Sequence, residues 1–151
     1  MRIFVTVGTT AFDELVEFVD NCPFFDEHEV TIQFGPSKYI PKNRKAFSFE
    51  KNIEAYYQSS DFVITHGGAG SIYKLLEMSL PICAIPNLER IDDHQLDICQ
   101  HLSNKEHLLF AKDISKIPDC IQSFIDGKIE LKPFKKDSFF CAKEIADYLL
   151  G

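Results

Sequence analysis

The sequence predicts an α/β domain with a Rossmann-like parallel sheet and helices on both of its faces. Short β-branched apolar runs alternate along the chain with segments whose apolar residues recur at helical spacing. Strands separated in this way by helices pair in parallel, because each helical crossover returns the chain across the sheet. The 151 residues, 45% of them hydrophobic, suffice for one core, so we expect a single domain over residues 1–151.

The elements follow in order from this alternation. The first strand, "RIFVTV", stops at Gly8, and a helix follows in which Phe12, Leu15, Val16 and Val19 share one face. Asn52 is expected to cap a later helix. The strands are expected at residues 2–7, 29–35, 45–49, 61–66, 81–86 and 108–111. The helices are expected at residues 9–21, 52–60, 71–79, 93–103, 115–125 and 139–150.

Composition excludes several classes of protein. A formal net charge of −7 argues against nucleic-acid binding, which needs a basic face. Five widely spaced cysteines without a CxxC pair suggest free thiols in a reducing cytosol rather than disulfides or zinc ligands. No apolar stretch is long enough for a signal peptide or a membrane span, so we expect a soluble cytoplasmic chain. The basic loop at residues 35–45 is either solvated or a surface for phosphate or a partner.

The glycines are concentrated where ligands bind in parallel sheets. Gly8 follows the first strand, and three of the seven glycines lie within residues 67–70, after the fourth. Ligands of open parallel sheets bind at the carboxyl ends of strands, and a glycine turn at a helix N-terminus favours phosphate. The alternative is that these glycines only permit a tight turn. Neither GxGxxG nor GxxxxGK[ST] occurs, so the ordinary NAD and P-loop signatures are absent.

The segment "HGGAGSIYKLLEMSLPICAIPNLERIDDHQLDICQHL" resembles the donor-binding signature of glycosyltransferase family 28 C-terminal domains. Its glycine turn, helix glutamate, P-x-x-x-x-P strand and downstream HQ come in the order typical of that family. The opening "IFVTVGTTAFDELV" resembles the branch that holds the small soluble subunit of the dolichol-linked N-acetylglucosamine transferase and the bacterial PssE-type exopolysaccharide subunits. This resemblance implies the donor-binding half of a GT-B glycosyltransferase.

The resemblance and the turn chemistry together indicate a set of UDP-sugar contacts. These are Gly8, Thr9, Thr10, His66, Gly67, Gly68, Ala69, Gly70, Ser71, Glu77, Asn87, His94 and Gln95.

The resemblance assigns roles to three of these residues. It gives Glu77 the ribose hydroxyls, which suits a carboxylate with two acceptor oxygens, and gives His94 and Gln95 the donor sugar. The alternatives are a solvated helix glutamate and an exposed helix N-terminus.

Other positions have structural alternatives beside a ligand role. Ser71 is expected to cap its helix, and capping explains at least one of Thr9 and Thr10. His66 contacts either a phosphate or the loop backbone, and Asp97 either orients His94 or meets a sugar hydroxyl. A looser match with the uracil-binding region involves Phe49, Asn52 and Ile53. The residues best explained as core or flank are Tyr56, Tyr57, Leu75 and Leu76.

The resemblance further implies how such a chain works. Helix N-termini would stabilise the leaving diphosphate without a metal, and no DxD triplet occurs; inversion at the anomeric carbon is implied by the family. No cofactor is expected beyond the UDP-sugar substrate. The acceptor-binding half, which supplies the general base, is expected on a membrane-anchored partner that holds a lipid-linked sugar.

The apolar segment 139–150 docks either on this partner or back on its own domain. A bacterial surface-polysaccharide pathway is the hypothesis that follows from the branch. The alternatives are a non-catalytic enhancer of a partner transferase and a UDP-sugar epimerase, which the chain length disfavours.

Overall fold

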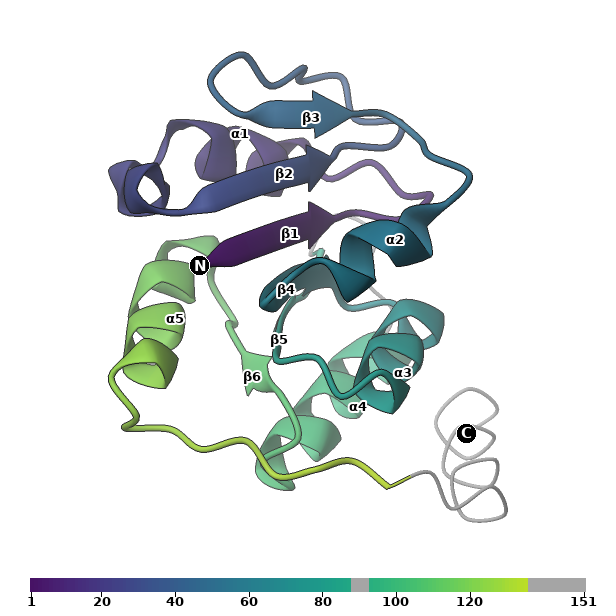
Figure 1. The fold of residues 1–151 in the computed structure, drawn as a ribbon. Coiled ribbons are helices and arrows are strands. Elements are labelled where there is room, and N and C mark those ends of the chain that lie inside the picture. The colour runs from purple at the N-terminus through teal and green to yellow at the C-terminus, as the bar shows by residue number, and fades with distance from the viewer. Residues whose placement is uncertain (88–92, 136–151) are drawn as a thin grey trace.

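The computed structural model describes residues 1–87 and 93–135, and within them the strands form one sheet in the order β3-β2-β1-β4-β5-β6 (Figure 1). Every neighbouring pair of these strands is parallel. The strands are β1 (Arg2–Thr6), β2 (Glu29–Gln33), β3 (Lys45–Phe47), β4 (Phe62–His66), β5 (Ile82–Ile85) and β6 (Leu109–Phe110). The helices are α1 (Asp13–Asn21), α2 (Ile53–Gln58), α3 (Ala69–Glu77), α4 (Asp93–Asn104) and α5 (Ile117–Ile125), with 3-10 turns at Pro23–Glu27 and Ile114–Lys116. This strand order is the Rossmann order, which confirms the predicted fold class.

The core has two layers because both faces of the sheet are covered. Helices α1 and α5 cover one face, where Leu15 and Ile121 meet strand residues such as Val5. Helices α2, α3 and α4 cover the other, where Leu75 and Ile98 pack with their neighbours. Strand residues alternate between the two layers, since successive side chains of a strand point to opposite faces. Most buried strand residues are therefore apolar, as is typical of a parallel sheet covered on both sides, and the buried polar exceptions are Thr6, Gln33 and Thr65.

The element boundaries differ from expectation mainly at helix starts. Helix α1 begins at Asp13, with Phe12 at its N-cap, so neither Thr9 nor Thr10 caps it. Instead the Thr10 amide donates to the Val7 carbonyl in a turn. Asn52 does occupy the N-cap position of α2, but its side chain makes no capping hydrogen bond. The segment 139–150, expected to be helical, lies outside the described residues.

The core assignments made from the sequence are confirmed. Tyr57, Leu75 and Leu76 are buried, and the half-buried ring of Tyr56 stacks on Phe4. Two short 3-10 turns were not predicted. One of them begins at Pro23, whose fixed φ suits the first position of a helical turn.

The loop at residues 35–45 is anchored rather than freely solvated. Its anchor is the fully buried carboxylate of Asp20, which accepts hydrogen bonds from the Tyr39 hydroxyl (2.7 Å) and from the Lys42 and Asn43 amides (2.9 and 3.0 Å). The Arg44 guanidinium binds the Val19 carbonyl at 2.7 Å. One of the loop's cations is thereby committed to holding the fold.

Candidate functional site

The two glycine turns lie side by side at the carboxyl edge of the sheet. Strands β1 and β4 pair directly, with Thr6 opposite Thr65, so the turns that follow them are neighbours. The chain continues from β1 to one side of the sheet and from β4 to the other. The turns therefore flank the topological switch point, where open α/β sheets bind their ligands.

The imidazole of His66 fills the space between these turns. A Cβ atom on Gly68 would lie 2.5 Å from Nε2 of His66, and one on Gly8 would lie 2.9 Å from Cε1. Gly8 also has a φ of +62°, which disfavours other residues. Gly68 has an ordinary extended backbone, so the histidine ring is what excludes a side chain there.

The start of α3 is open to solvent and to an incoming anion. Gly68 is the N-cap residue and offers no capping side chain, and the first turn carries no acidic residue. The first amides of a helix have no partner within the helix, and their partial positive charge attracts anions. Gly70, in this turn, is exposed, and a Cβ there would meet nothing within 4 Å. Ser71 was expected to cap the helix, but it is the third helical residue and does not.

A polar cavity of about 290 Å³ opens beside this turn. It is lined by Thr10, His66, Asn87 and Gln95, from the turn after β1, the end of β4, the loop after β5 and the first turn of α4. Asn87 is buried and its amide donates to the Ala11 carbonyl at 2.9 Å, which joins two of the loops. The structure thus brings four of the predicted site residues around one hollow.

His66 is held as a neutral ring within this hollow. Burial lowers its pKa, and a backbone interaction with Thr6 offsets part of that effect. Its Nδ1 is buried without a hydrogen-bond partner among the residues that the structure describes. A neutral imidazole offers one N–H donor and one acceptor nitrogen, which suits a phosphate oxygen or a hydroxyl group.

Glu77 is not brought to this cavity. It is the last residue of α3, and at 1.5 Å per residue it stands about 13 Å along the helix from Gly68. Glu77 is exposed, and one turn before it the exposed Lys74 forms an ion pair with Glu54 of α2. Glu77 is therefore outside the lining of the cavity, and its ribose contact stays a prediction from the sequence.

The remaining candidates lie at different distances from the cavity. His94 is half-buried next to Gln95 on α4 and does not line it, and Thr9 is exposed in the first turn. Asp97 is exposed and lines a separate cavity of about 430 Å³ together with Lys112. Phe49 is 59% exposed, in the loop between β3 and α2.

Gln33 is a site residue that sequence reasoning missed. Its side chain is buried and makes hydrogen bonds at both ends of the amide: Oε1 accepts from the Thr6 hydroxyl (2.6 Å) and the Gly8 amide (3.1 Å). Nε2 donates to the carbonyls of Gly8 (3.0 Å) and Ser48 (2.8 Å). Gln33 therefore fixes the first glycine turn and ties it to the segment that carries Phe49. The only signal in the sequence was a polar residue at the end of an apolar strand.

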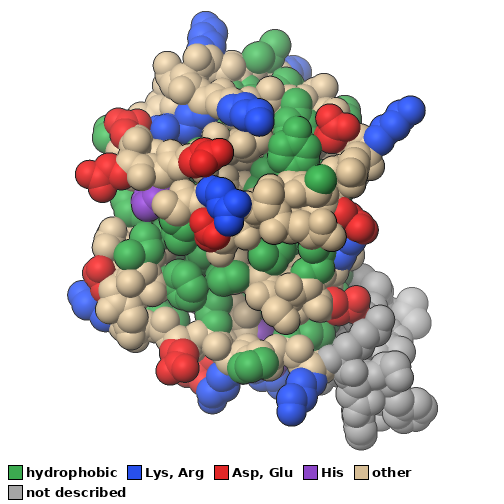
Figure 2. Space-filling model, viewed as in Figure 1, with side chains coloured by type: hydrophobic (Ala, Val, Ile, Leu, Met, Phe, Trp, Pro, Cys, Tyr) green, Lys and Arg blue, Asp and Glu red, His purple; other side chains and the backbone are tan. Residues whose placement is uncertain are grey.

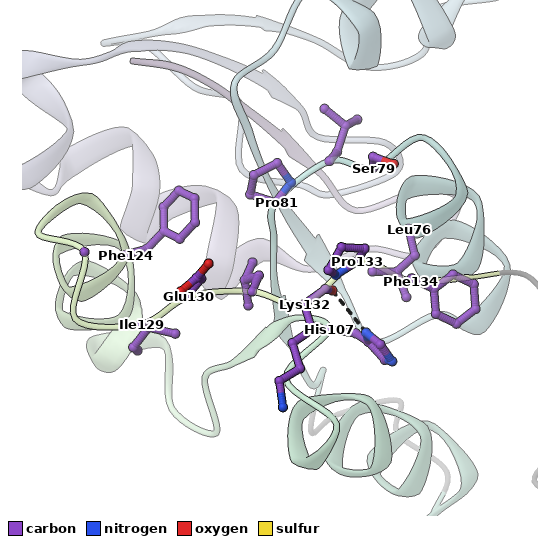
Figure 3. A pocket seen from close by; sticks show the side chains of 13 residues that line it. Leu76, Ser79, Pro81, His107, Phe124, Ile129, Glu130, Lys132, Pro133 and Phe134 are labelled. Atoms are coloured by element: carbon purple, nitrogen blue, oxygen red, sulfur yellow. Dashed lines mark hydrogen bonds between the residues drawn. The ribbon is translucent and has the colours of Figure 1, made fainter.

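A larger cavity, of about 530 Å³, lies at the opposite edge of the sheet (Figure 3). The segment after α5 forms one wall, where Nδ1 of His107 lies 3.1 Å from the Lys132 carbonyl, and Pro81 lies on the wall before β5. On the face drawn in Figure 2, apolar side chains are interspersed with charges of both signs. This cavity lies where the strands begin, away from the glycine turns, so we assign it no part in the site.

Comparison with known proteins identifies relatives of this chain. The model of the family "Glycosyltransferase family 28 C-terminal domain" matches residues 2–126. The mouse protein "UDP-N-acetylglucosamine transferase subunit ALG13" is 34% identical over 123 residues, 73% of this chain and 10% of the mouse protein. The Bacteroides fragilis "UDP-N-acetylglucosamine--N-acetylmuramyl-(pentapeptide) pyrophosphoryl-undecaprenol N-acetylglucosamine transferase" is 34% identical over 98 residues, 65% of this chain and 26% of that protein.

The fold agrees with these relatives. The NMR solution structure of ALG13 superposes with a TM-score of 0.69 at 21% identity and covers 98% of this chain and 96% of that one. Other structural neighbours are GT-B glycosyltransferases, which contain this Rossmann-like fold as one of two halves. The chain spans about a tenth of the mouse relative and a quarter of the Bacteroides one.

Proposed function

Because the chain belongs to the glycosyltransferase family 28 C-terminal domain family, we propose that it binds a UDP-sugar at the polar cavity and is the donor-binding catalytic subunit of a two-component inverting glycosyltransferase. The observation that carries this proposal is the uncapped start of α3 beside the cavity of Thr10, His66, Asn87 and Gln95. This site suits a diphosphate next to a sugar. The backbone amides and the dipole of the helix attract phosphate, and the neutral hydrogen-bond donors and acceptors of the cavity wall suit hydroxyl groups.

The proposed chemistry is displacement of UDP from the anomeric carbon. Negative charge develops on the leaving diphosphate as the glycosidic bond breaks. The N-terminus of α3 faces that charge with fixed amide dipoles, and it carries no carboxylate that would compete. In this proposal Gln95, which lines the cavity from the first turn of α4, contacts the sugar together with its neighbour His94, and Thr10 lies on the wall that follows β1. We propose that binding of UDP does not require a divalent metal.

The general base and the acceptor site belong, in this proposal, to a second subunit. The names of the relatives support it: the mouse protein is called a subunit, and the acceptor in the Bacteroides name is a pyrophosphoryl-undecaprenol. Within residues 1–87 and 93–135, none of the helices has both the length and the apolar character needed to cross a membrane. We propose recruitment from the cytoplasm by a membrane-anchored partner that holds a lipid-linked acceptor, as part of polysaccharide synthesis.

Gly70 offers the sharpest test of the phosphate site. Its Cβ position is empty, so Gly70→Asp and Gly70→Asn both fit, and a carboxylate in the first turn favours the helix. The same carboxylate repels a bound diphosphate. We expect Gly70→Asp to weaken UDP binding about tenfold or more, which is ~1.4 kcal/mol, relative to Gly70→Asn.

The measurement is calorimetric titration of the full chain with UDP, in magnesium and in EDTA. Thermal melting of both Gly70 variants checks that they fold equally well. Equal affinity of the two variants for UDP would show that the start of α3 does not bind the phosphates. Failure of the folded wild-type chain to bind UDP, alone and when co-purified with its partner, would leave the enhancer role as the better reading.

A further inference from the structure

The loop between β2 and β3 gathers positive charge on an otherwise acidic chain. Residues 35–45 contain four of the 16 Lys and Arg residues of the chain and none of its 23 Asp and Glu residues. Lys38, Lys42 and Lys45 are exposed, and Nζ of Lys45 lies 6.0 Å from the centroid of the Tyr56 ring. At the top of Figure 2, above β3, Lys and Arg side chains lie beside hydrophobic ones.

The carboxylates that bind this loop hold its backbone and its arginine rather than its lysines. Asp20 accepts hydrogen bonds from loop amides, and Asp26 forms an ion pair with Arg44 at 2.9 Å. Among the residues that the structure describes, no ion pair engages the side chain of Lys38 or Lys42. Their charge is therefore available to an anion outside the chain.

An apolar side chain projects between these two lysines. Ile40 is 62% exposed, more than any other large hydrophobic side chain in the described part of the chain. The loop is ordered on both sides of it. The Tyr39 amide donates to Asp13 at 2.6 Å, and the ring of Pro41 fixes the backbone φ that follows. Ile40 is therefore held in water by the loop rather than packed on the core.

We propose that the tip of this loop, formed by Lys38, Ile40 and Lys42, docks on the surface of a membrane that contains anionic lipids. The two ammonium groups pair with lipid phosphates, and Ile40 enters the boundary between headgroups and acyl chains. Long lysine side chains reach the headgroups from that depth. The occupant is a lipid surface rather than a free anion, because a small phosphate would leave Ile40 in water.

The position of the loop leaves the proposed donor site open. The loop leads into β3, an edge strand of the sheet, whereas the polar cavity is lined from the ends of β1, β4 and β5 and from α4. Docking through the loop uses no residue of that cavity. It goes beyond the recruitment proposed above, because the chain itself contacts the bilayer. A weak contact of this kind adds to a partner's hold on the same surface.

The test is co-sedimentation of the full chain with phosphatidylcholine vesicles, with and without about one third phosphatidylglycerol. We expect binding to the phosphatidylglycerol vesicles alone, and we expect added salt to weaken it because exposed charges are screened. Lys38→Glu combined with Lys42→Glu should lower the partition coefficient about tenfold or more. The matched control is Lys116→Glu combined with Lys128→Glu, at the two ends of α5, where both lysines are exposed. This pair makes the same change in net charge and should lower the coefficient less than about twofold.

Ile40 provides a second readout, because the chain contains no tryptophan. Ile40→Trp introduces a single fluorophore, and its emission should move to shorter wavelength on phosphatidylglycerol vesicles as the ring enters the interface. Ile125→Trp, at a position 44% exposed at the end of α5, should not respond. Circular dichroism melting checks that each variant folds.

Three results would overturn the proposal. The folded wild-type chain binds both kinds of vesicle equally, or the control pair weakens binding as much as the loop pair does. In the third, the loop pair loses a partner subunit while its vesicle binding is unchanged, which would assign the loop to a protein interface. Calorimetric titration with UDP in the absence of vesicles keeps this test separate from the proposed function. The loop pair should bind UDP as the wild-type chain does, since neither lysine lines the cavity.

Discussion

Nε2 of His66 lies 2.5 Å from the position that a Cβ atom on Gly68 would occupy, so the ring and the glycine turn determine each other. One residue on β4 thereby shapes the start of α3, two positions later. The same ring stands 2.9 Å from the Cβ position of Gly8. The two turns of the proposed site are coupled through a single side chain.

This contact predicts a non-additive pair of substitutions. Gly68→Ala alone should destabilise the fold by about 1–3 kcal/mol, because the new methyl group overlaps the His66 ring. In a His66→Ala background, Gly68→Ala should destabilise the fold by at least about 1 kcal/mol less than it does in the wild-type chain. Urea unfolding of the four proteins measures the cycle. Strict additivity would show that the ring moves aside at no cost.

The buried amide of Gln33 predicts a large loss of stability. Gln33→Leu leaves the amide and carbonyl of Gly8 without the side chain that binds both, and it also removes the partner of the Thr6 hydroxyl. We expect a loss of about 3 kcal/mol in unfolding free energy. Gln122→Leu, on the exposed surface of α5, should change it by less than about 0.5 kcal/mol. Comparable effects in the two variants would contradict the anchoring role.

The carboxylate of Asp20 predicts a specific acid sensitivity. Burial acts to raise its pKa, but hydrogen bonds from Lys42, Tyr39 and Asn43 together hold it below the ordinary value of 3.8. The stabilisation is therefore complete above that ordinary value and is lost as the pH falls through the lower, folded value. Asp20→Asn should lower stability at pH 7 and flatten the acid side of the curve. Urea midpoints between pH 7 and pH 2.5 measure this, with the exposed Asp119→Asn as the control.

The lowered pKa of His66 predicts a signature of ligand binding. Because burial favours the neutral ring, its NMR titration should centre below the ordinary 6.5, and stability should decline as the pH falls from 6.5 through that midpoint. A diphosphate bound at the start of α3 favours the protonated ring, so UDP should raise the midpoint. His107, at the other edge of the sheet, should not respond to UDP. An unshifted His66 midpoint at saturating UDP would place the phosphates elsewhere.

Glu77 tests how far the proposed nucleotide site extends along α3. It stands at the far end of α3 from the glycine turn, and a ribose contact there predicts that Glu77→Ala raises the Kd for UDP about tenfold. Gln95→Ala, which changes the cavity wall, should weaken UDP-sugar binding more than UDP binding. Calorimetric titration of both variants measures this. A Kd that Glu77→Ala leaves within about twofold would contradict the ribose contact that the sequence suggests.

The periodic pattern of apolar residues along the chain predicted the fold class. Alternating apolar runs and helical spacings predicted each of the strands and α-helices that the structure describes, because parallel strands covered on both faces are mostly apolar. Helix starts were less predictable. Thr9, Thr10 and Ser71 have the chemistry of caps, but Phe12 and Gly68 hold those positions. A cap is chosen by where the chain turns, which depends on the packing of the helix behind it.

The order and spacing of residues were enough to predict the class of fold, the carboxyl-edge location of the glycine turns and the family that they resemble. Those properties follow from local spacing, which survives without any knowledge of distant contacts. Contacts in the folded chain were needed to show that the His66 ring lies between Gly8 and Gly68, that Gln33 anchors the first turn and that Glu77 lies outside the cavity lining. Each of these depends on how loops from different strands lie beside one another, and the loops come together only when the sheet has formed.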